Sequence, residues 1–469
     1  MSFVSFEFLV LFTTVFAAYW NSSRRIQNVV LVVASYVFYG WWDWRFLSLI
    51  AGSTVLDYVV GRLLEGASGR RRGILLAVSV VANLSLLGFF KYFGFFTESF
   101  SELLQSAGLG AWADVPTLEI ILPVGISFYT FQTLSYTIDV YRGRLAASRS
   151  LVEFALYVSF FPQLVAGPIE RASHFLPQIQ GDRSLTWDRV SRGGFLILFG
   201  LFKKVGVADG VAPFVDRVFA DSGAHGGEVL AAVYLFAFQI YADFSGYSDI
   251  ARGVSKFLGF DLMVNFRVPY FSGNPSEFWR RWHISLSSWL RDYLYIPLGG
   301  NRRGSVRTYR NLLATMLLGG LWHGAAWNFV LWGAYQGALL CGFRLLGGER
   351  GGDSEPPLWQ RLLKAAIFFQ LVCFGWLLFR CDSLVACFDF GARVLSSPFD
   401  QLSAPSLSAL TWASLMLLAT CDLCEYRVDD PRWYERLPLA VRTLLYASLA
   451  VLALGGLLNR SNTFIYFQF

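Results

Sequence analysis

Long apolar runs separated by short basic loops dominate the pattern of this chain. A membrane-spanning helix needs about 20 mostly apolar residues. Runs of roughly that length recur along the sequence, as at Ile26 to Trp42, Ile74 to Phe90 and Thr443 to Leu458. The pattern predicts an all-α polytopic membrane protein with roughly ten to twelve membrane segments and no soluble domain.

Composition supports this fold class. The 469 residues are 55% hydrophobic and only 15% charged, with a mean hydropathy of +0.46, whereas a soluble domain carries about a quarter charged residues. The net charge of +6 mostly reflects cytoplasmic Arg and Lys, so we expect no nucleic-acid partner. We expect no cleavable signal peptide either, because Glu7 interrupts the first apolar run and no basic stretch precedes it.

The basic loops also predict an orientation. Arg24 and Arg25 follow the first apolar run, which puts that loop in the cytoplasm and the N-terminus outside. The cluster from Arg427 to Arg442 places the last loop inside and the C-terminus outside as well. Both termini are therefore expected on the outer side of the membrane.

Two regions do not fit simple crossings. The run from Leu151 to Ile169 has basic residues on both sides and contains prolines, which favours a re-entrant or interfacial segment. Residues 251–311 are Arg-rich and broken by prolines, so they predict a large cytoplasmic or re-entrant region. The next run, Leu312 to Leu346, is too long for one crossing and is expected to enter and return. Gly347 to Pro357 then reads as a polar cytoplasmic linker.

Two histidines lie in very apolar, Trp-rich surroundings. His323 sits about eleven residues into its run, which corresponds to about 16 Å of depth, near the middle of a 30 Å hydrocarbon core. His283 lies in the preceding basic region. Because a neutral imidazole can accept a proton from a hydroxyl group, we predict both as catalytic, with His323 as the base. The alternative is a histidine hydrogen-bonded between helices. His174 and His225 are interpreted as loop residues.

Other chemistry has weaker support. Asp243 and Asp249 sit late in a membrane run and are interpreted chiefly as structural partners of arginines, while Lys203 and Lys204 are expected to face protein or to snorkel. Cys421 and Cys424 form a lone CxxC without further ligands, so no metal site is predicted. The positive-inside rule explains most arginines near His283. Those beside aromatic residues are candidates for holding phosphates of a cofactor, namely Arg280, Arg281 and Arg291, together with Trp279 and Trp282.

Several blocks of the sequence resemble the membrane-bound O-acyltransferase (MBOAT) superfamily, in particular its alginate O-acetyltransferase branch. The matching blocks are ASYVFYGWW, LPVGISFYTFQTLSYTIDVYRG, FPQLVAGPIER, DFSGYSD, NFRVPY, EFWRRWHISLSSWLRDYLYIPLGGNR, LGGLWHGAAWNFVLWGAYQG and FIYFQF. They span nearly the whole chain, and the WRRWHISLS block is specific. The resemblance implies one domain over residues 1–469, a bundle with re-entrant segments, and a central channel whose two funnels meet at His323.

The resemblance also implies a function. The donor is expected to be cytosolic acetyl-CoA, and the acetyl group is expected to leave on the periplasmic side of the inner membrane. A periplasmic or membrane-anchored SGNH-type acetyltransferase is the expected partner, with an exported polysaccharide (alginate-like, cellulose or peptidoglycan) as the final acceptor. Alternatives are direct O-acylation of a small or lipid hydroxyl compound and, from a different class, a transporter or flippase. No inverted hydropathy repeat is evident to favour transport.

Overall fold

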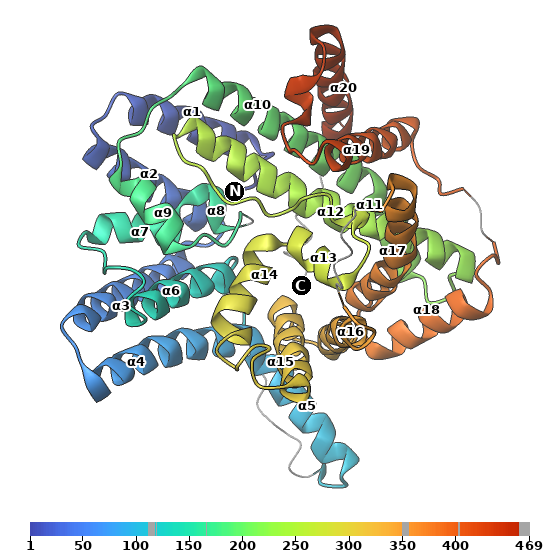
Figure 1. Cartoon of the computed structure of the whole chain (residues 1–469), viewed down its shortest axis with the longest axis horizontal. Coiled ribbons are helices and arrows are strands. Elements are labelled where there is room, and N and C mark those ends of the chain that lie inside the picture. Colours follow the sequence, from blue (N-terminus) through green and yellow to red (C-terminus); the bar gives the residue numbers. More distant parts are fainter. Residues whose placement is uncertain (111–117, 119, 166, 349–355, 402–403, 459–469) are drawn as a thin grey trace. The chain divides into compact units, whose positions relative to one another are not determined.

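The computed structural model describes residues 1–469 except 111–117, 119, 166, 349–355, 402–403 and 459–469. Throughout the described ranges the regular structure is helical, without a β-strand, which confirms the all-α prediction. The chain forms two compact units (Figure 1). Unit 1 comprises Met1–Gly193 and Ala251–Met263, and unit 2 comprises Gly194–Ile250 and Val264–Phe469. The expectation of one domain over residues 1–469 stays a prediction.

Unit 1 is built from the N-terminal helices. They are α1 (Phe6–Trp20), α2 (Arg24–Gly40), η1 (Trp44–Phe46), α3 (Leu47–Glu65), α4 (Gly69–Leu87), η2 (Gly88–Tyr92), α5 (Phe93–Ser106), α6 (Ile126–Tyr141), α7 (Leu151–Ser159), α8 (Phe161–Leu164) and α9 (Ala172–Gln180). Helices α10 (Trp187–Leu201) and α12 (Gly226–Phe257) begin in one unit and end in the other.

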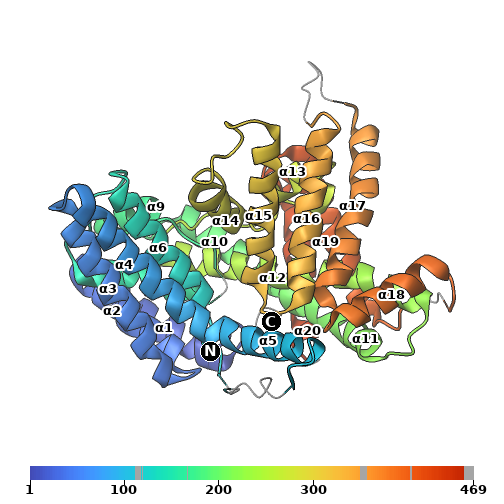
Figure 2. The ribbon, with the colours of Figure 1, turned by 90° about the horizontal axis from the view of Figure 1, so that it is seen from below.

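A buried polar cluster joins three neighbouring helices of unit 1. Asp57 on α3 accepts hydrogen bonds from Ser79, from Asn83 Nδ2 at 2.8 Å and from Thr137 Oγ1 at 3.1 Å. Its donors lie on α4 and α6, which run beside α3 in Figures 1 and 2. A buried carboxylate is tolerated only when its oxygens are hydrogen-bonded, so this cluster specifies how the three helices align.

The predicted break in the run from Leu151 to Ile169 is present. Helix α7 ends at Ser159, the four-residue α8 follows, and the chain then reaches α9 without regular structure at Pro168 to Arg171. Pro168 and Ile169 are buried, so the irregular backbone is covered by protein, as such backbone must be at membrane depth. Whether the segment is re-entrant stays a prediction.

Unit 2 contains the candidate site. Its helices are η4 (Phe202–Ala208), α11 (Asp209–Ala220), η5 (Pro269–Phe271), α13 (Pro275–Arg281), α14 (Ile284–Leu290), η6 (Arg291–Tyr295), α15 (Ser305–His323), α16 (Trp327–Leu345), α17 (Leu358–Arg380), α18 (Leu384–Ser396), α19 (Ala409–Val428), η7 (Trp433–Arg436) and α20 (Leu439–Leu457). Figure 2 shows α15 and α16 side by side, joined by a short turn.

The α15–α16 hairpin is tight because glycines face each other in it. A Cβ atom on Gly320 would lie 2.2 Å from the carbonyl oxygen of Phe329, and one on Gly333 would lie 2.4 Å from that of Met316. Small residues at these positions let the two backbones approach closely, as in many membrane helix pairs. The run from Leu312 to Leu346 reverses its direction as a helical hairpin, while its entry into the membrane and return stay a prediction. Most of the predicted linker from Gly347 to Pro357 lies outside the described residues.

Five helical stretches of the described chain are long and apolar enough to cross a membrane. They are Trp44–Glu65, Gly69–Ser106, Gly226–Phe257, Leu358–Arg380 and Leu439–Leu457. Fewer helices qualify than the ten to twelve segments expected, because several apolar runs form shorter helices, such as α2 with 17 residues and α6 with 16. The protein is a multi-pass membrane protein.

Candidate active site

His323 is the last residue of α15, at the turn of the glycine-lined hairpin. Helix α15 begins at Ser305 and stops where Gly324 takes an extended conformation. The predicted depth of His323 near the middle of the hydrocarbon core stays a prediction. The imidazole is nevertheless buried, with 6% of the residue exposed. A chain reversal thus holds this histidine inside unit 2.

Aromatic rings surround His323. Its ring centroid lies 5.0 Å from that of Trp322, 5.1 Å from Trp332 on α16 and 5.4 Å from Phe379 on α17. All three contacts are edge-to-face, with interplanar angles of 76–85°, a favourable arrangement for aromatic pairs. The rings from three helices fix the orientation of the imidazole and keep its surroundings apolar.

His283 lies at the start of α14 in an unusual backbone conformation. Its φ of 43° and ψ of 53° are left-handed, which is uncommon for a non-glycine residue and costs about 1–3 kcal/mol. The residue is fully buried, and burial lowers the pKa of its imidazole to about 3. His283 is therefore neutral at physiological pH. Strained backbone of this kind is found at functional sites more than elsewhere.

The two histidines share one aromatic neighbour. The Trp322 ring lies 5.9 Å from the His283 ring and 5.0 Å from the His323 ring, measured between centroids. Tertiary structure thus brings together two residues that are 40 positions apart in the sequence. Two buried imidazoles around one indole can offer proton acceptors to a hydroxyl group in a site with little water.

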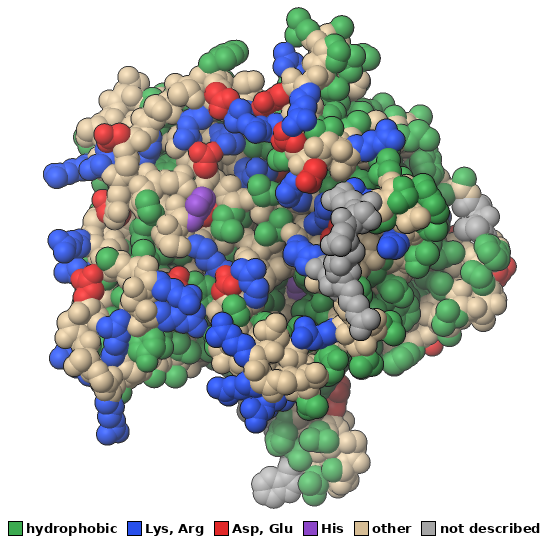
Figure 3. Space-filling view, viewed as in Figure 1, with side chains coloured by type: hydrophobic (Ala, Val, Ile, Leu, Met, Phe, Trp, Pro, Cys, Tyr) green, Lys and Arg blue, Asp and Glu red, His purple; other side chains and the backbone are tan. Residues whose placement is uncertain are grey.

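The candidate phosphate-binding side chains differ in accessibility. Arg280 and Arg291 are exposed, and Arg281 is half-buried, paired with Glu277 at 3.1 Å. Figure 3 shows Lys and Arg side chains gathered on the face that carries α14 and the start of α15, where Arg302, Arg303 and Arg307 are exposed. This segment of unit 2 suits an anionic ligand.

The two candidate tryptophans also differ. Trp282 is 1% exposed and stacks on Phe278 at 5.6 Å, inside the aromatic core of unit 2. Trp279 is half-buried, with its ring 5.9 Å from that of Trp332. Contact of a bound cofactor with Trp282 stays a prediction, but its packing alone accounts for its position.

The aspartates of the DFSGYSD block pair with lysines, which the sequence analysis did not name as their partners. Lys204 Nζ lies 2.7 Å from Asp243 and 2.8 Å from Asp209, and Lys203 Nζ lies 2.5 Å from Asp249. Both lysines are buried, with side-chain exposures of 1% and 5%, which confirms that they face protein. The sequence analysis did not recognise that the adjacent lysines Lys203 and Lys204 could pair with the two aspartates of this block.

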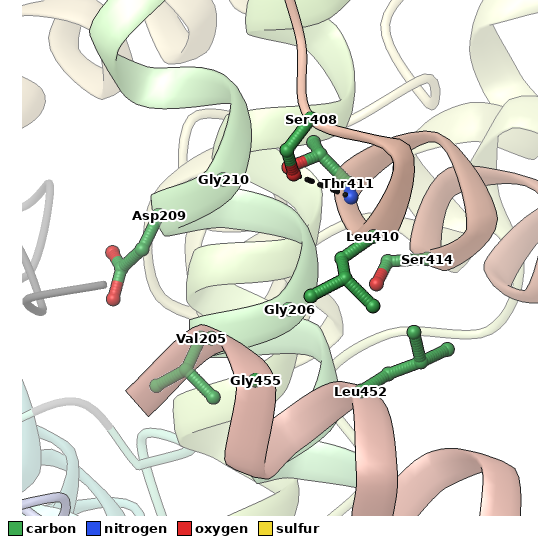
Figure 4. A pocket seen from close by; sticks show the side chains of 11 residues that line it. Val205, Gly206, Asp209, Gly210, Ser408, Leu410, Thr411, Ser414, Leu452 and Gly455 are labelled. Atoms are coloured by element: carbon green, nitrogen blue, oxygen red, sulfur yellow. Dashed lines mark hydrogen bonds between the residues drawn. The ribbon is translucent and has the colours of Figure 1, made fainter. Parts of the chain in front are cut away.

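A small cavity of about 30 Å³ lies beside this charge cluster (Figure 4). Its walls come from η4, α11, α19 and α20, with Asp209, Gly210, Thr411 and Ser414 among the lining residues, and neither His283 nor His323 lines it. A space of this size holds a water molecule or two and no acyl donor. We assign it to helix packing around the buried charges.

The other two histidines have structural partners. His174 is part of α9, not of a loop as expected, and its Nδ1 lies 2.7 Å from the buried carboxylate of Glu170. His225 precedes α12 in a connection, as predicted, and its Nδ1 lies 2.8 Å from Asp400. Within the described ranges, no three His, Cys, Asp or Glu side chains gather as metal ligands would.

Comparisons with known proteins agree with this arrangement. A family model described as MBOAT, membrane-bound O-acyltransferase family, matches residues 142–347. The chain is 40% identical over 501 residues to a probable alginate O-acetylase of Pseudomonas putida, covering 100% of both chains. It is 43% identical over 427 residues to a probable alginate O-acetylase of Azotobacter vinelandii, covering 89% of this chain and 83% of that one.

A peptidoglycan O-acetyltransferase of Helicobacter pylori is 37% identical over 384 residues, which is 76% of this chain and 71% of that protein. The matched region 142–347 contains both buried histidines and the whole basic segment between them. The resemblance stated from the sequence motifs is confirmed. The chain belongs to the membrane-bound O-acyltransferase family, and it is an O-acyltransferase.

Proposed function

We propose that this protein is a membrane O-acetyltransferase that draws acetyl groups from cytosolic acetyl-CoA for the O-acetylation of an exported cell-surface polysaccharide. The observation that carries the proposal is the pair of buried histidines around Trp322, which supplies bases for transfer to a hydroxyl group. Relatives named for acetylation of alginate and of peptidoglycan support an acetyl donor and a glycan acceptor.

The chemistry is the transfer of an acetyl group from a thioester to a hydroxyl. His323 takes the hydroxyl proton as the oxygen forms a bond to the acetyl carbonyl carbon. The carbon–sulfur bond then breaks, and the CoA thiolate leaves and accepts that proton from the imidazolium. Atoms and charge balance without a metal or an oxidant. The aromatic surroundings of His323 exclude water, which would otherwise hydrolyse the thioester.

Acetyl-CoA enters from the cytoplasm along the basic segment from Phe266 to Arg303 in this proposal. Charge reversal at Arg280, Arg281 or Arg291 removes a charge-assisted phosphate contact of about 1.5 kcal/mol and raises the KM for acetyl-CoA roughly tenfold. Arg432→Glu is the matched control, because Arg432 is an exposed arginine of unit 2 outside this segment. Equal KM values for all these variants and the wild type would rule out this path.

The acceptor is reached from the periplasmic side in this proposal. CoA is large and charged, so it stays in the cytoplasm, while the acetyl group alone passes His323 through a channel across the inner membrane. An SGNH-type acetyltransferase in the periplasm or on the membrane receives it, and both termini of this chain face that side. The tail from Phe464 to Phe469, a candidate docking element, lies outside the described residues. Deletion of this tail is followed by measuring partner co-purification and acetyl-CoA hydrolysis. Loss of the partner with hydrolysis intact supports docking by the tail, whereas loss of both supports packing of the tail into the helix bundle.

The decisive test follows radiolabel from acetyl-CoA into the acceptor fraction. His323→Ala should lower transfer at least about a hundredfold, the low end for a missing general acid or base. His225→Ala is the control, since this histidine of unit 2 is partly exposed and pairs with Asp400. Wild-type turnover in the purified His323→Ala protein would refute the role of His323 as the base. A wild-type protein that transfers no acetyl group would refute the proposed function itself.

A further inference from the structure

Asn265 contacts His283 in a way that selects one tautomer of the imidazole. We infer that Asn265 is a positioning residue that holds the proton of neutral His283 on Nδ1, so that Nε2 is the ring atom that accepts a hydrogen bond from the reacting hydroxyl or thiol. This inference rests on the proposed acetyl transfer for its functional meaning. Its structural content, the position of the proton, stands on the contacts alone.

The segment that carries Asn265 is paired with the turn that carries His283. After α12 the chain has no regular secondary structure up to Phe266, and the backbone N–H of Ile284 donates to the carbonyl oxygen of Asn265 at 2.9 Å. Two residues further on, the N–H of Arg267 donates to the carbonyl oxygen of Arg281 at 3.0 Å. These two bonds fix the Asn265 backbone directly beside His283, and Asn265 itself is 1% exposed.

Two donors of Ser285 beside the Asn265 amide establish which of its ends is the oxygen. The backbone N–H of Ser285 lies 3.3 Å from Oδ1, and the hydroxyl of Ser285 lies 3.0 Å from it. A backbone N–H can only donate, so the atom it meets must be the acceptor oxygen. The other end of the amide, Nδ2, then donates to the Ser248 hydroxyl at 3.3 Å.

The identity of that oxygen determines the tautomer of His283. Nδ1 of the imidazole lies 3.1 Å from Asn265 Oδ1. Since an amide oxygen has no proton to give, Nδ1 must carry the hydrogen of this bond. In a neutral imidazole the second nitrogen then has the lone pair, which makes Nε2 the acceptor. Histidines that ligate metals are oriented by the same device, a hydrogen bond from the remote ring nitrogen.

Three aromatic rings pack around the His283 imidazole. Phe244 meets the imidazole edge-to-face at 4.7 Å, Phe266 lies 6.3 Å away on another side, and Trp322 lies 5.9 Å away. All three rings are neutral, and none of them carries a hydrogen-bond acceptor for the Nδ1 proton, because the indole N–H of Trp322 can only donate. Asn265 also anchors the left-handed turn at His283 through its backbone, which offsets part of the strain there.

Nitrogen-15 NMR of histidine-labelled full-length protein in lipid nanodiscs tests the assignment directly. The His283 signals are identified by their absence in His283→Gln. We expect a protonated Nδ1 and an unprotonated Nε2 in the wild type, and the loss of that fixed pattern in Asn265→Ala. A wild-type His283 with its proton on Nε2 would overturn the inference. This spectrum needs no substrate, so it can fail or succeed independently of the proposed acetyl transfer.

Turnover of acetyl-CoA tests the functional meaning. Asn265→Ala should lower kcat at least about tenfold, because the residue acts through His283. The KM for acetyl-CoA should change less than about twofold, because Asn265 does not contact acetyl-CoA in this proposal. Asn265→Asp keeps an oxygen acceptor for Nδ1 and should restore the NMR pattern and most of kcat. Unchanged kcat in Asn265→Ala, or equal losses in Asn265→Ala and Asn265→Asp, would overturn the positioning role.

A matched control separates positioning from general loss of structure. Asn83 is equally buried, with 1% exposure, and its side chain bonds to Asp57 in unit 1. Asn83→Ala should lower the thermal stability and leave the His283 spectrum unchanged. An altered His283 spectrum in Asn83→Ala would show that the signal reports folding in general and would overturn the inference. If Asn265→Ala fails to fold, Asn265→Asp tests the inference instead. A wild-type His283 NMR pattern with most of kcat supports the positioning role, and loss of both overturns it.

Discussion

Lys204 is the centre of a buried charge cluster in unit 2, and its removal is the sharpest available test of how this unit is held together. Its ammonium group lies 2.7 Å from Asp243 on α12 and 2.8 Å from Asp209 on α11. The substitution Lys204→Met keeps the volume and the apolar stem of the side chain. It removes the charge that compensates two carboxylates inside the protein.

The expected cost follows from burial. The side chain of Lys204 is 1% exposed, and those of Asp243 and Asp209 are 3% and 5% exposed. Breaking a buried ion pair by removing one partner costs about 3–5 kcal/mol, because the remaining charge is left without compensation. For a unit of this size that corresponds to a fall in Tm of about 10 °C. An exposed pair contributes about 0–1 kcal/mol.

Thermal unfolding of the detergent-purified protein, followed by the loss of the monodisperse peak in size-exclusion chromatography, measures the effect. Arg62→Met is the control, since Arg62 pairs with Glu65 at 3.0 Å with side chains 40% and 37% exposed. It should shift Tm by about 2 °C or less. The double substitution Lys204→Met with Asp243→Asn should recover part of the loss, because it removes one of the uncompensated charges. A Tm of Lys204→Met within about 2 °C of wild type would refute the reasoning.

Three further predictions concern the site and its supports. His283→Ala should lower kcat, and unchanged kcat together with unchanged acetyl-CoA affinity would reduce His283 to a packing residue. Gly320→Ala should lower Tm and activity together, because its Cβ would lie 2.2 Å from a carbonyl oxygen of α16, whereas Gly52→Ala, with nothing within 4 Å, should do neither. The hydrogen bond to Glu170 raises the pKa of His174. This ion pair therefore stabilises the fold fully below the unfolded pKa of about 6.5, and the contribution is lost as pH rises through the raised folded-state pKa. His174→Gln should remove that pH dependence from Tm, and a wild-type stability that rises over this range would contradict the sign.

The amino-acid sequence by itself determined the class of this protein. Apolar runs of about 20 residues are a local property of the chain, so the helical membrane fold and the reversal between Leu312 and Leu346 could be predicted. The blocks around His283 and His323 are equally local, and their residues alone carry the resemblance to the family. For the two lysines in an apolar run, the sequence left two alternatives, facing protein or snorkelling, and the structure shows them buried in protein.

Tertiary structure alone decided which side chains meet. His323 ends α15 because glycines let α16 turn back there, which no count of residues into an apolar run could show. Lys204 pairs with Asp243, which lies 39 positions later in the chain, and Asn265 reaches His283 from 18 positions earlier. A hydrophobic pattern specifies that a segment is buried, but a hydrogen bond or ion pair requires two particular atoms within about 3 Å. That proximity arises only when distant segments pack together.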